Sequence, residues 1–224
     1  MIRALALKEL RETAGFAVLA TLAYLSIVAG MVGMQPFARL LRKQSTGVPF
    51  VDTEVLQLFT IVAIAFTLVL GFRQAAWEVN QGTYQYLLHR PLRRSAIFLI
   101  KLGVGIVMFV VCTAVPLLLY ALWAAMPGTH SSPFVWSMTE PAWRFCLGMP
   151  LIYLGAFLSG LRPGRWYGTR LLPLAGAGAI TGLLLLIPTV SLIRMPLSIF
   201  IPVLVVMYGL TITAICYVAE ARAY

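Results

Sequence analysis

The chain has 224 residues, of which 61% are hydrophobic and only 11% are charged. Soluble domains carry about 25% charged residues, so this composition excludes an ordinary soluble protein and indicates an integral membrane protein. The net charge of +10 does not indicate nucleic-acid binding, because that function needs basic groups gathered on a folded polar surface. Here they stand in loops beside apolar segments, where they orient the chain and attract anionic lipid headgroups.

Six apolar stretches follow one another along the chain with short connections, each close to the roughly 20 residues that cross a bilayer. They are expected at about residues 15–34, 55–72, 97–126, 145–161, 171–186 and 197–218. They leave no room for a soluble domain, so residues 1–224 are expected to form one membrane domain. The predicted fold class is therefore an all-α integral membrane protein with six transmembrane helices.

The N-terminal segment 1–12 precedes the first span. Ile2 and Leu5 fall on one helical face, and Lys8, Arg11 and Glu12 fall on another at i, i+3 and i+4. This pattern predicts a short helix lying in the membrane interface; the alternative is the charged flank of the first span. A cleavable signal peptide is not expected, because the apolar run that follows is longer than the 7–15 residues of such a segment.

Prolines and tryptophans mark several later connections. Residues 127–144 are predicted to be a loop whose Trp136 and Trp143 suit the membrane interface. Pro116 is expected to kink the third span. Between residues 188 and 202, prolines and Arg194 interrupt the apolar pattern, which leaves open a broken or re-entrant segment there.

The distribution of Lys and Arg predicts that both termini are cytoplasmic. Twelve fall on that side: Arg3, Lys8, Arg11, Arg73, Arg90, Arg93, Arg94, Lys101, Arg162, Arg165, Arg170 and Arg222. Five fall outside: Arg39, Arg42, Lys43, Arg144 and Arg194. An excess of basic residues marks the cytoplasmic side of a membrane protein.

The stretch from Arg73 to Lys101 is a long polar interruption between the second and third spans, and it must lie in water. It contains six charged residues: Arg73, Glu78, Arg90, Arg93, Arg94 and Lys101. It is predicted to form two short helices separated by a break, the first over residues 74–81. Lys101 is expected to extend its side chain to the lipid headgroups from the start of the third span.

The second of these helices is expected to carry an apolar face. Gly82 can end the first helix and Thr83 can cap the next turn. In that turn Tyr84, Leu87 and Leu88 fall at i, i+3 and i+4, on one face. An apolar face held out of the bilayer needs a partner to bury it.

This stretch resembles the cytoplasmic loop of ABC type-2 transporter permeases, the membrane subunits of ATP-binding cassette exporters. The residues that carry the resemblance are Glu78-x-x-x-Gly82-Thr83, then Leu87, Leu88, Pro91, Arg94 and Lys101. In that family the loop is a coupling element that contacts the ATPase. The resemblance implies that the same role falls to Glu78, Gly82, Thr83, Tyr84, Leu87, Leu88, Pro91 and Arg94, with Lys101 as a membrane-interface anchor.

The resemblance also implies the partners of this chain. It would pair with itself or with a similar permease, as a homodimer or heterodimer, in a prokaryotic inner membrane. Two separate cytoplasmic ATPase subunits would hold ATP and Mg, so this chain would need no cofactor and would not be an enzyme. Glu78 would fix the loop through an ion pair with Arg73, Arg93 or Arg94.

The sequence lacks the residues that ATP binding, ion-coupled transport and metal binding would each require. A phosphate-binding loop needs Lys directly after Gly, and Lys8, Lys43 and Lys101 follow other residues. All seven acids fall in termini, loops or span ends, which argues against an ion-coupled carrier and favours an apolar or amphipathic cargo. His89 and His130 stand alone, and the three cysteines lack metal-site spacing, so no metal site is expected.

Two other functions remain open from the sequence. One is a haem-exporter-type permease of cytochrome maturation, which is similar in size and span count. The other is a membrane scaffold that uses the same loop to recruit an ATPase and transports nothing.

Overall fold

The computed structural model describes residues 2–34, 49–50, 53–80, 94–129, 133–162, 169–190 and 196–221, and for residues 53–55, 78–80, 94 and 186–190 it describes the backbone alone. These ranges are helical and contain no β-strand. The elements are α1 (Ile2–Met31), α2 (Thr53–Asn80), α4 (Arg94–Ala125), η2 (Trp136–Thr139), α5 (Glu140–Gly148), α6 (Pro150–Leu161), η3 (Thr169–Leu171), α7 (Leu172–Val190) and α8 (Leu197–Ala221).

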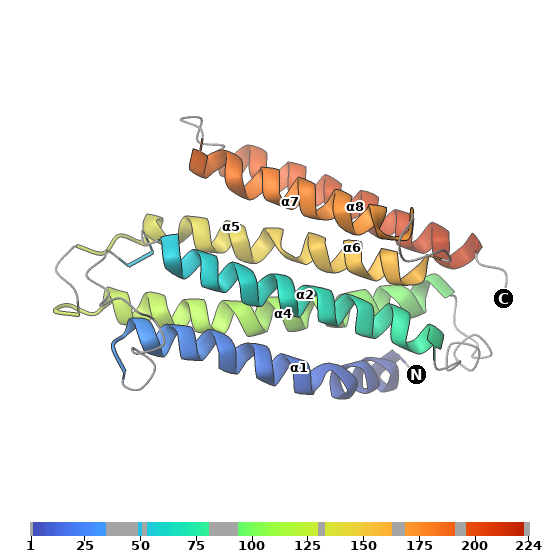
Figure 1. Cartoon of the computed structure of the whole chain (residues 1–224), viewed down its shortest axis with the longest axis horizontal. Coiled ribbons are helices and arrows are strands. Elements are labelled where there is room, and N and C mark those ends of the chain that lie inside the picture. The colour runs from blue at the N-terminus through green and yellow to red at the C-terminus, as the bar shows by residue number, and fades with distance from the viewer. Residues whose placement is uncertain are drawn as a thin grey trace.

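The helices lie along one axis of the molecule, and the chain crosses from end to end of this bundle with each long element (Figure 1). α5 and α6 together make one crossing, because the helix breaks at Met149 before Pro150, which has no N–H for a helical hydrogen bond. The start of α1 and the end of α8 lie at the same end of the bundle, which we name the termini end (Figure 1). The end of α2 and the start of α4 also lie there.

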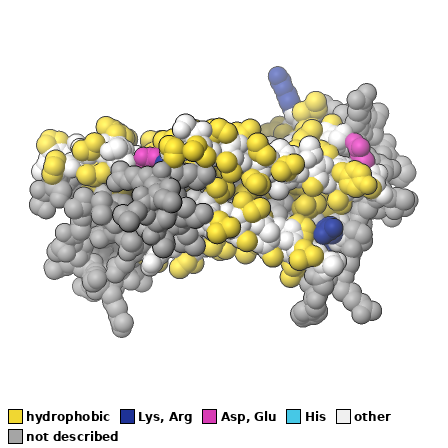
Figure 2. All heavy atoms as spheres, turned by 90° about the horizontal axis from the view of Figure 1, so that it is seen from above, with side chains coloured by type: hydrophobic (Ala, Val, Ile, Leu, Met, Phe, Trp, Pro, Cys, Tyr) yellow, Lys and Arg dark blue, Asp and Glu magenta, His cyan; other side chains and the backbone are white. Residues whose placement is uncertain are grey.

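The chain is a multi-pass integral membrane protein. Within the described residues, five segments are long and apolar enough to span a bilayer: Ile2–Met31, Leu56–Trp77, Ser95–Ala125, Trp136–Leu161 and Leu197–Ala221. Figure 2 shows apolar side chains along the described surface, with the few charged ones toward the two ends. Five of the six predicted spans fall on these segments, and the sixth, 171–186, falls on the shorter apolar segment Thr169–Leu185.

α6 is the centre of the bundle, and each of its residues is buried. It lies against α2 through small residues spaced four apart, which let helix backbones approach closely. A side chain at Gly71 of α2 would place its Cβ 2.7 Å from Ala156 Cβ, and one at Gly160 of α6 would place its Cβ 2.7 Å from Ala75 Cβ. Gly155 makes a similar approach to α7, with Pro173 O at 3.0 Å from such a Cβ. Larger side chains at these positions would force the helices apart.

Two predictions about the termini end are wrong. Residues 1–12 do not form a separate interfacial helix, because α1 runs without a break from Ile2 to Met31 and buries Leu5. The second span does not end at Phe72, because α2 continues to Asn80 with Gln74 buried. In both cases the charged residues predict a helix boundary in water, whereas the structure continues the helix through them.

The predicted loop 127–144 is also wrong in its second half. Residues 136–148 are helical, as η2 and α5, and Pro141 lies in the first turn of α5, where its missing N–H removes no helical hydrogen bond. α7 is described as far as Val190 and α8 runs unbroken from Leu197 through Pro202, while residues 191–195 lie outside the described residues. Apart from Pro196, the described parts of 188–202 therefore belong to the ends of two helices.

Candidate functional site

The connection that carries the predicted coupling residues leaves and enters the bundle at the termini end (Figure 1). Gly82, Thr83, Tyr84, Leu87, Leu88 and Pro91 lie outside the described residues. Glu78 belongs to the last turn of α2 and Arg94 begins α4, each described by its backbone alone. The structure therefore fixes where this connection starts and ends, and the roles of its side chains stay predictions.

Basic residues gather in the same half of the molecule. Most of the described basic positions lie in or directly beside the helix segments nearer the termini end, and Arg144 of α5 lies in the other half; those nearer the termini end are Arg3, Lys8, Arg11, Arg73, Arg94, Lys101, Arg162 and Arg170. This distribution matches the one expected for the cytoplasmic side.

A buried ion pair joins α1 to α4 near the termini end. Lys101 Nζ lies 2.9 Å from Glu9 Oε1, and each side chain is 1% exposed. Thr13, one turn after Glu9, donates its hydroxyl to the Glu9 carbonyl oxygen at 2.7 Å and lies 3.0 Å from Met108 Sδ of α4. The contrast with Lys8 and Glu12 is clear, because that pair is 3.5 Å apart with both side chains 40% exposed and stabilises little.

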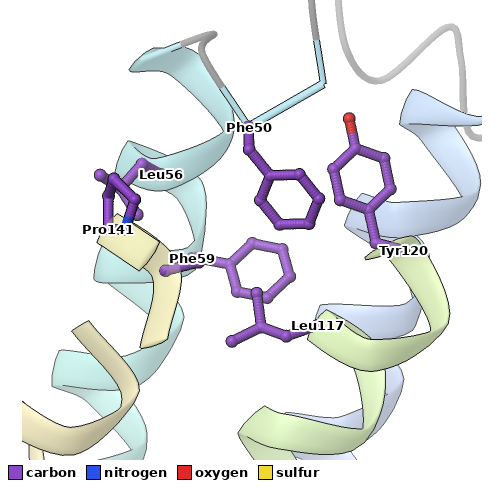
Figure 3. Close-up of a pocket in the computed structure, with 7 residues that line it drawn as sticks. Phe50, Leu56, Phe59, Leu117, Tyr120 and Pro141 are labelled. Atoms are coloured by element: carbon purple, nitrogen blue, oxygen red, sulfur yellow. The ribbon is translucent and has the colours of Figure 1, made fainter. Parts of the chain in front are cut away.

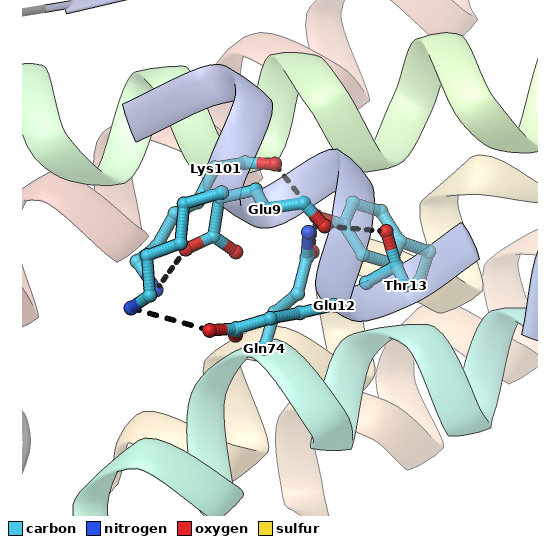
Figure 4. Close-up of polar contacts among 7 residues, drawn as sticks. Glu9, Glu12, Thr13, Gln74 and Lys101 are labelled. Carbon is cyan, nitrogen blue, oxygen red and sulfur yellow. Dashed lines mark hydrogen bonds and ion pairs between the residues drawn. The ribbon is translucent and has the colours of Figure 1, made fainter. Parts of the chain in front are cut away.

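A second pair of polar side chains continues this cluster into α2 and α6. Tyr153 of α6 donates its hydroxyl to Gln74 Oε1 at 2.6 Å and lies 3.4 Å from the Lys101 carbonyl oxygen. Gly105 of α4 makes room for it, because a Cβ there would collide with the Tyr153 ring and hydroxyl. We name Glu9, Thr13, Gln74, Lys101 and Tyr153 the buried polar cluster; Figure 4 shows Glu9, Gln74 and Lys101 converging between their helices.

The buried polar cluster corrects two predictions. Lys101 does not extend to the headgroups, because it is fully buried and pairs with Glu9. Glu9 is not a solvated terminal acid, so the sequence argument that every acid lies outside the packed spans fails for it. The spacing of Leu5, Glu9 and Thr13, four residues apart, is the signal that could have placed Glu9 on the buried face of α1.

The buried polar cluster holds opposite charges in a protein interior, but within the described ranges no three His, Cys, Asp or Glu side chains come together in a way that could hold a metal ion. The cluster supplies one carboxylate, one ammonium group, an amide, a phenol and the hydroxyl of Thr13. What it offers is a buried pair of opposite charges at the contact of α1 with α4.

The opposite end of the bundle carries a small apolar hollow between α2, α4 and α5. Phe50 and Phe59 point into it beside Leu117 (Figure 3), and the Phe50 ring lies 4.7 Å from the Tyr120 ring, between centroids. Phe50 holds a left-handed backbone, with φ of 66°, which is uncommon for a bulky residue. The hollow has no charged side chain in its lining.

No family model matches this chain, and no curated protein matches it.

Proposed function

We propose that this chain is the membrane permease subunit of an ABC-type exporter, which forms a transport pathway as a pair of subunits and is driven by separate ATPase subunits. The observation that supports the proposal is the position of the two helix ends, Asn80 of α2 and Arg94 of α4, that flank the connection 81–93. Its two ends lie at the termini end of the bundle (Figure 1), in the half that holds most of the described basic residues. By the positive-inside rule this end faces the cytoplasm, where ATP is available.

That connection is joined along the chain to two membrane helices, the end of α2 and the start of α4. Movement of a partner bound to the apolar face of Tyr84, Leu87 and Leu88 would therefore tilt both helices. Opening and closing of the pathway would follow from the two conformations of the ATPase pair.

The experiment is a pull-down of the tagged chain, in detergent, from its native membranes, in which the proposal expects an ATP-binding-cassette ATPase to co-purify. Burial of a Leu side chain contributes roughly 1.5–3 kcal/mol, so Leu87→Ala should weaken the contact about tenfold or more. Leu87→Asp should weaken it further, because it would bury an unpaired charge. Gln85→Asp is the matched control, since it adds the same charge away from the expected face.

The proposal fails if the Leu87→Asp chain inserts normally and still binds its ATPase as well as the control does. A complex that forms but never transports any cargo would favour the scaffold.

A further inference from the structure

A contribution to stability does not by itself explain why Glu9 and Lys101 form a buried ion pair. Removal of two charges from water is costly, and replacement of a buried ion pair by apolar residues of similar size is often neutral or stabilising. The neighbouring contact between the same helices is apolar, with Leu5, Ile97 and Ile100 packed together. Two more apolar residues at positions 9 and 101 would extend that contact. The ion pair therefore points to a property that an apolar contact lacks.

That property is the ability to separate into water. Glu9 and Lys101 each lie seven residues from the start of their helix, which is about 10 Å at 1.5 Å per residue. If the first turns of α1 and α4 part, water reaches both charges and their hydration offsets the lost contact. An apolar pair would gain nothing from the same water. The ion pair thus brings the closed and parted states closer in free energy.

The surroundings supply a second set of contacts for the parted state. Gln74 is 4% exposed, and its Nε2 has no hydrogen-bond partner among the described residues. The Gln74 side chain reaches from α2 toward Glu9 (Figure 4). A carboxylate released from Lys101 would find an amide donor there.

We propose that the Glu9–Lys101 pair is a latch between α1 and α4 that closes the termini end of the bundle and opens when α4 is displaced at its start. The force for opening rests on the proposed function, because the connection 81–93 leads directly into α4. The latch itself does not depend on a partner, since it follows from the burial of the pair and its distance from the helix ends.

The test measures how often Leu5, which is 3% exposed, becomes accessible to water. Cys112, Cys146 and Cys216 are replaced by alanine, Leu5→Cys is introduced, and the chain is reconstituted in lipid nanodiscs. The rate of labelling by a charged maleimide is then compared for the native pair, for Glu9→Leu with Lys101→Met, and for the exchange Glu9→Lys with Lys101→Glu. Leu7→Cys, at a site that is 59% exposed, is the control and should label equally in all three.

The apolar pair should label about tenfold or more slowly than the native pair, the fold-change that corresponds to about 1.4 kcal/mol. The exchanged pair should label at nearly the native rate. Equal rates for the apolar and native pairs would overturn the latch. If Leu5→Cys does not fold, Ile97→Cys on the facing helix, also 3% exposed, gives the same comparison.

Addition of the ATPase with ATP separates the two proposals. Faster labelling of the native pair, with no change for the apolar pair, supports both. If the apolar pair labels more slowly than the native pair but the ATPase with ATP leaves the labelling of the native pair unchanged, the latch is supported and the proposed function is contradicted. If the chain assembles with the ATPase but the apolar and native pairs label at equal rates, the proposed function is supported and the latch is contradicted.

Discussion

The close approach of α2 to α6 predicts that Gly71→Ala destabilises the bundle. The added Cβ would lie 2.7 Å from Ala156 Cβ, 2.8 Å from the Tyr153 carbonyl oxygen and 3.0 Å from the Phe157 amide nitrogen. Non-bonded carbon atoms prefer about 3.5–4.0 Å, so the contact with Ala156 is too short by about 1 Å. Two of the three neighbouring atoms are backbone, so rotation of a side chain cannot relieve the collision, and α6 must move.

The magnitude is the difference between two opposing effects. Overpacking of a well-packed interior costs typically about 1–3 kcal/mol, and replacement of a helical Gly by Ala gains about 1 kcal/mol. Movement of α6 is resisted on its far side by the approach of Gly155 to α7, which favours the upper part of the cost. We expect a net loss of about 1–2 kcal/mol, which corresponds to a fall in Tm of about 2–8 °C for a chain of this size.

The assay is thermal unfolding of the purified chain in detergent, followed by circular dichroism. Gly103→Ala is the matched control, because Gly103 also lies within a long helix but no neighbouring atom lies within 4 Å of its added Cβ. It should leave Tm unchanged or raise it. If Gly71→Ala melts at or above the temperature of Gly103→Ala, the α2–α6 contact is looser than described and the reasoning fails.

Three further predictions test the function, the polar cluster and the orientation. The purified chain alone should not hydrolyse ATP and should show hydrolysis only in complex with its partner, since no Lys follows a Gly; sustained hydrolysis by the isolated chain would falsify this. Tyr153→Phe should lower stability by about 1 kcal/mol because Gln74 loses its hydroxyl donor, whereas Tyr217→Phe, 75% exposed, should change nothing in the same melting assay. A cysteine introduced at Gly47 should react with an impermeant reagent only from outside the cell, and reaction from the cytoplasm would reverse the proposed orientation.

The spans could be predicted from the sequence because their signal is a simple one. About 20 apolar residues in a row form a helix in lipid, where every backbone polar group needs an internal partner. The predicted positions 55–72, 97–126 and 197–218 all lie within observed helices, apart from one residue, Met126. Boundaries were less predictable, because Pro141 serves equally as a loop residue or as part of a first helical turn.

The buried polar cluster was missed because charged residues were read one by one along the sequence. Glu9 and Lys101 each lie near a helix end, and in isolation each is expected to face water. Their burial depends on which face of α1 meets which face of α4, a relation between residues 92 positions apart in sequence. The close contact of α2 with α6 could have been predicted from the sequence. Gly71 and Ala75 are spaced four apart, as are Ala156 and Gly160, and this spacing of small residues is typical of closely packed helix pairs.

The two kinds of contact predict where movement begins under the proposed function. α6 meets α2 and α7 by close backbone approach, whereas α1 meets α4 at the termini end through side chains and one ion pair. A pull on the start of α4 should therefore part it from α1 while α2, α6 and α7 move together. Spin labels at Leu7 of α1 and Leu99 of α4, both exposed, should change their separation when ATP is added to the complex. Labels at Ile61 of α2 and Leu183 of α7 are the control, and their separation should not change. A change confined to this control pair would mean that the helices move at their contacts with α6, which would contradict the assignment of movement to the α1–α4 contact.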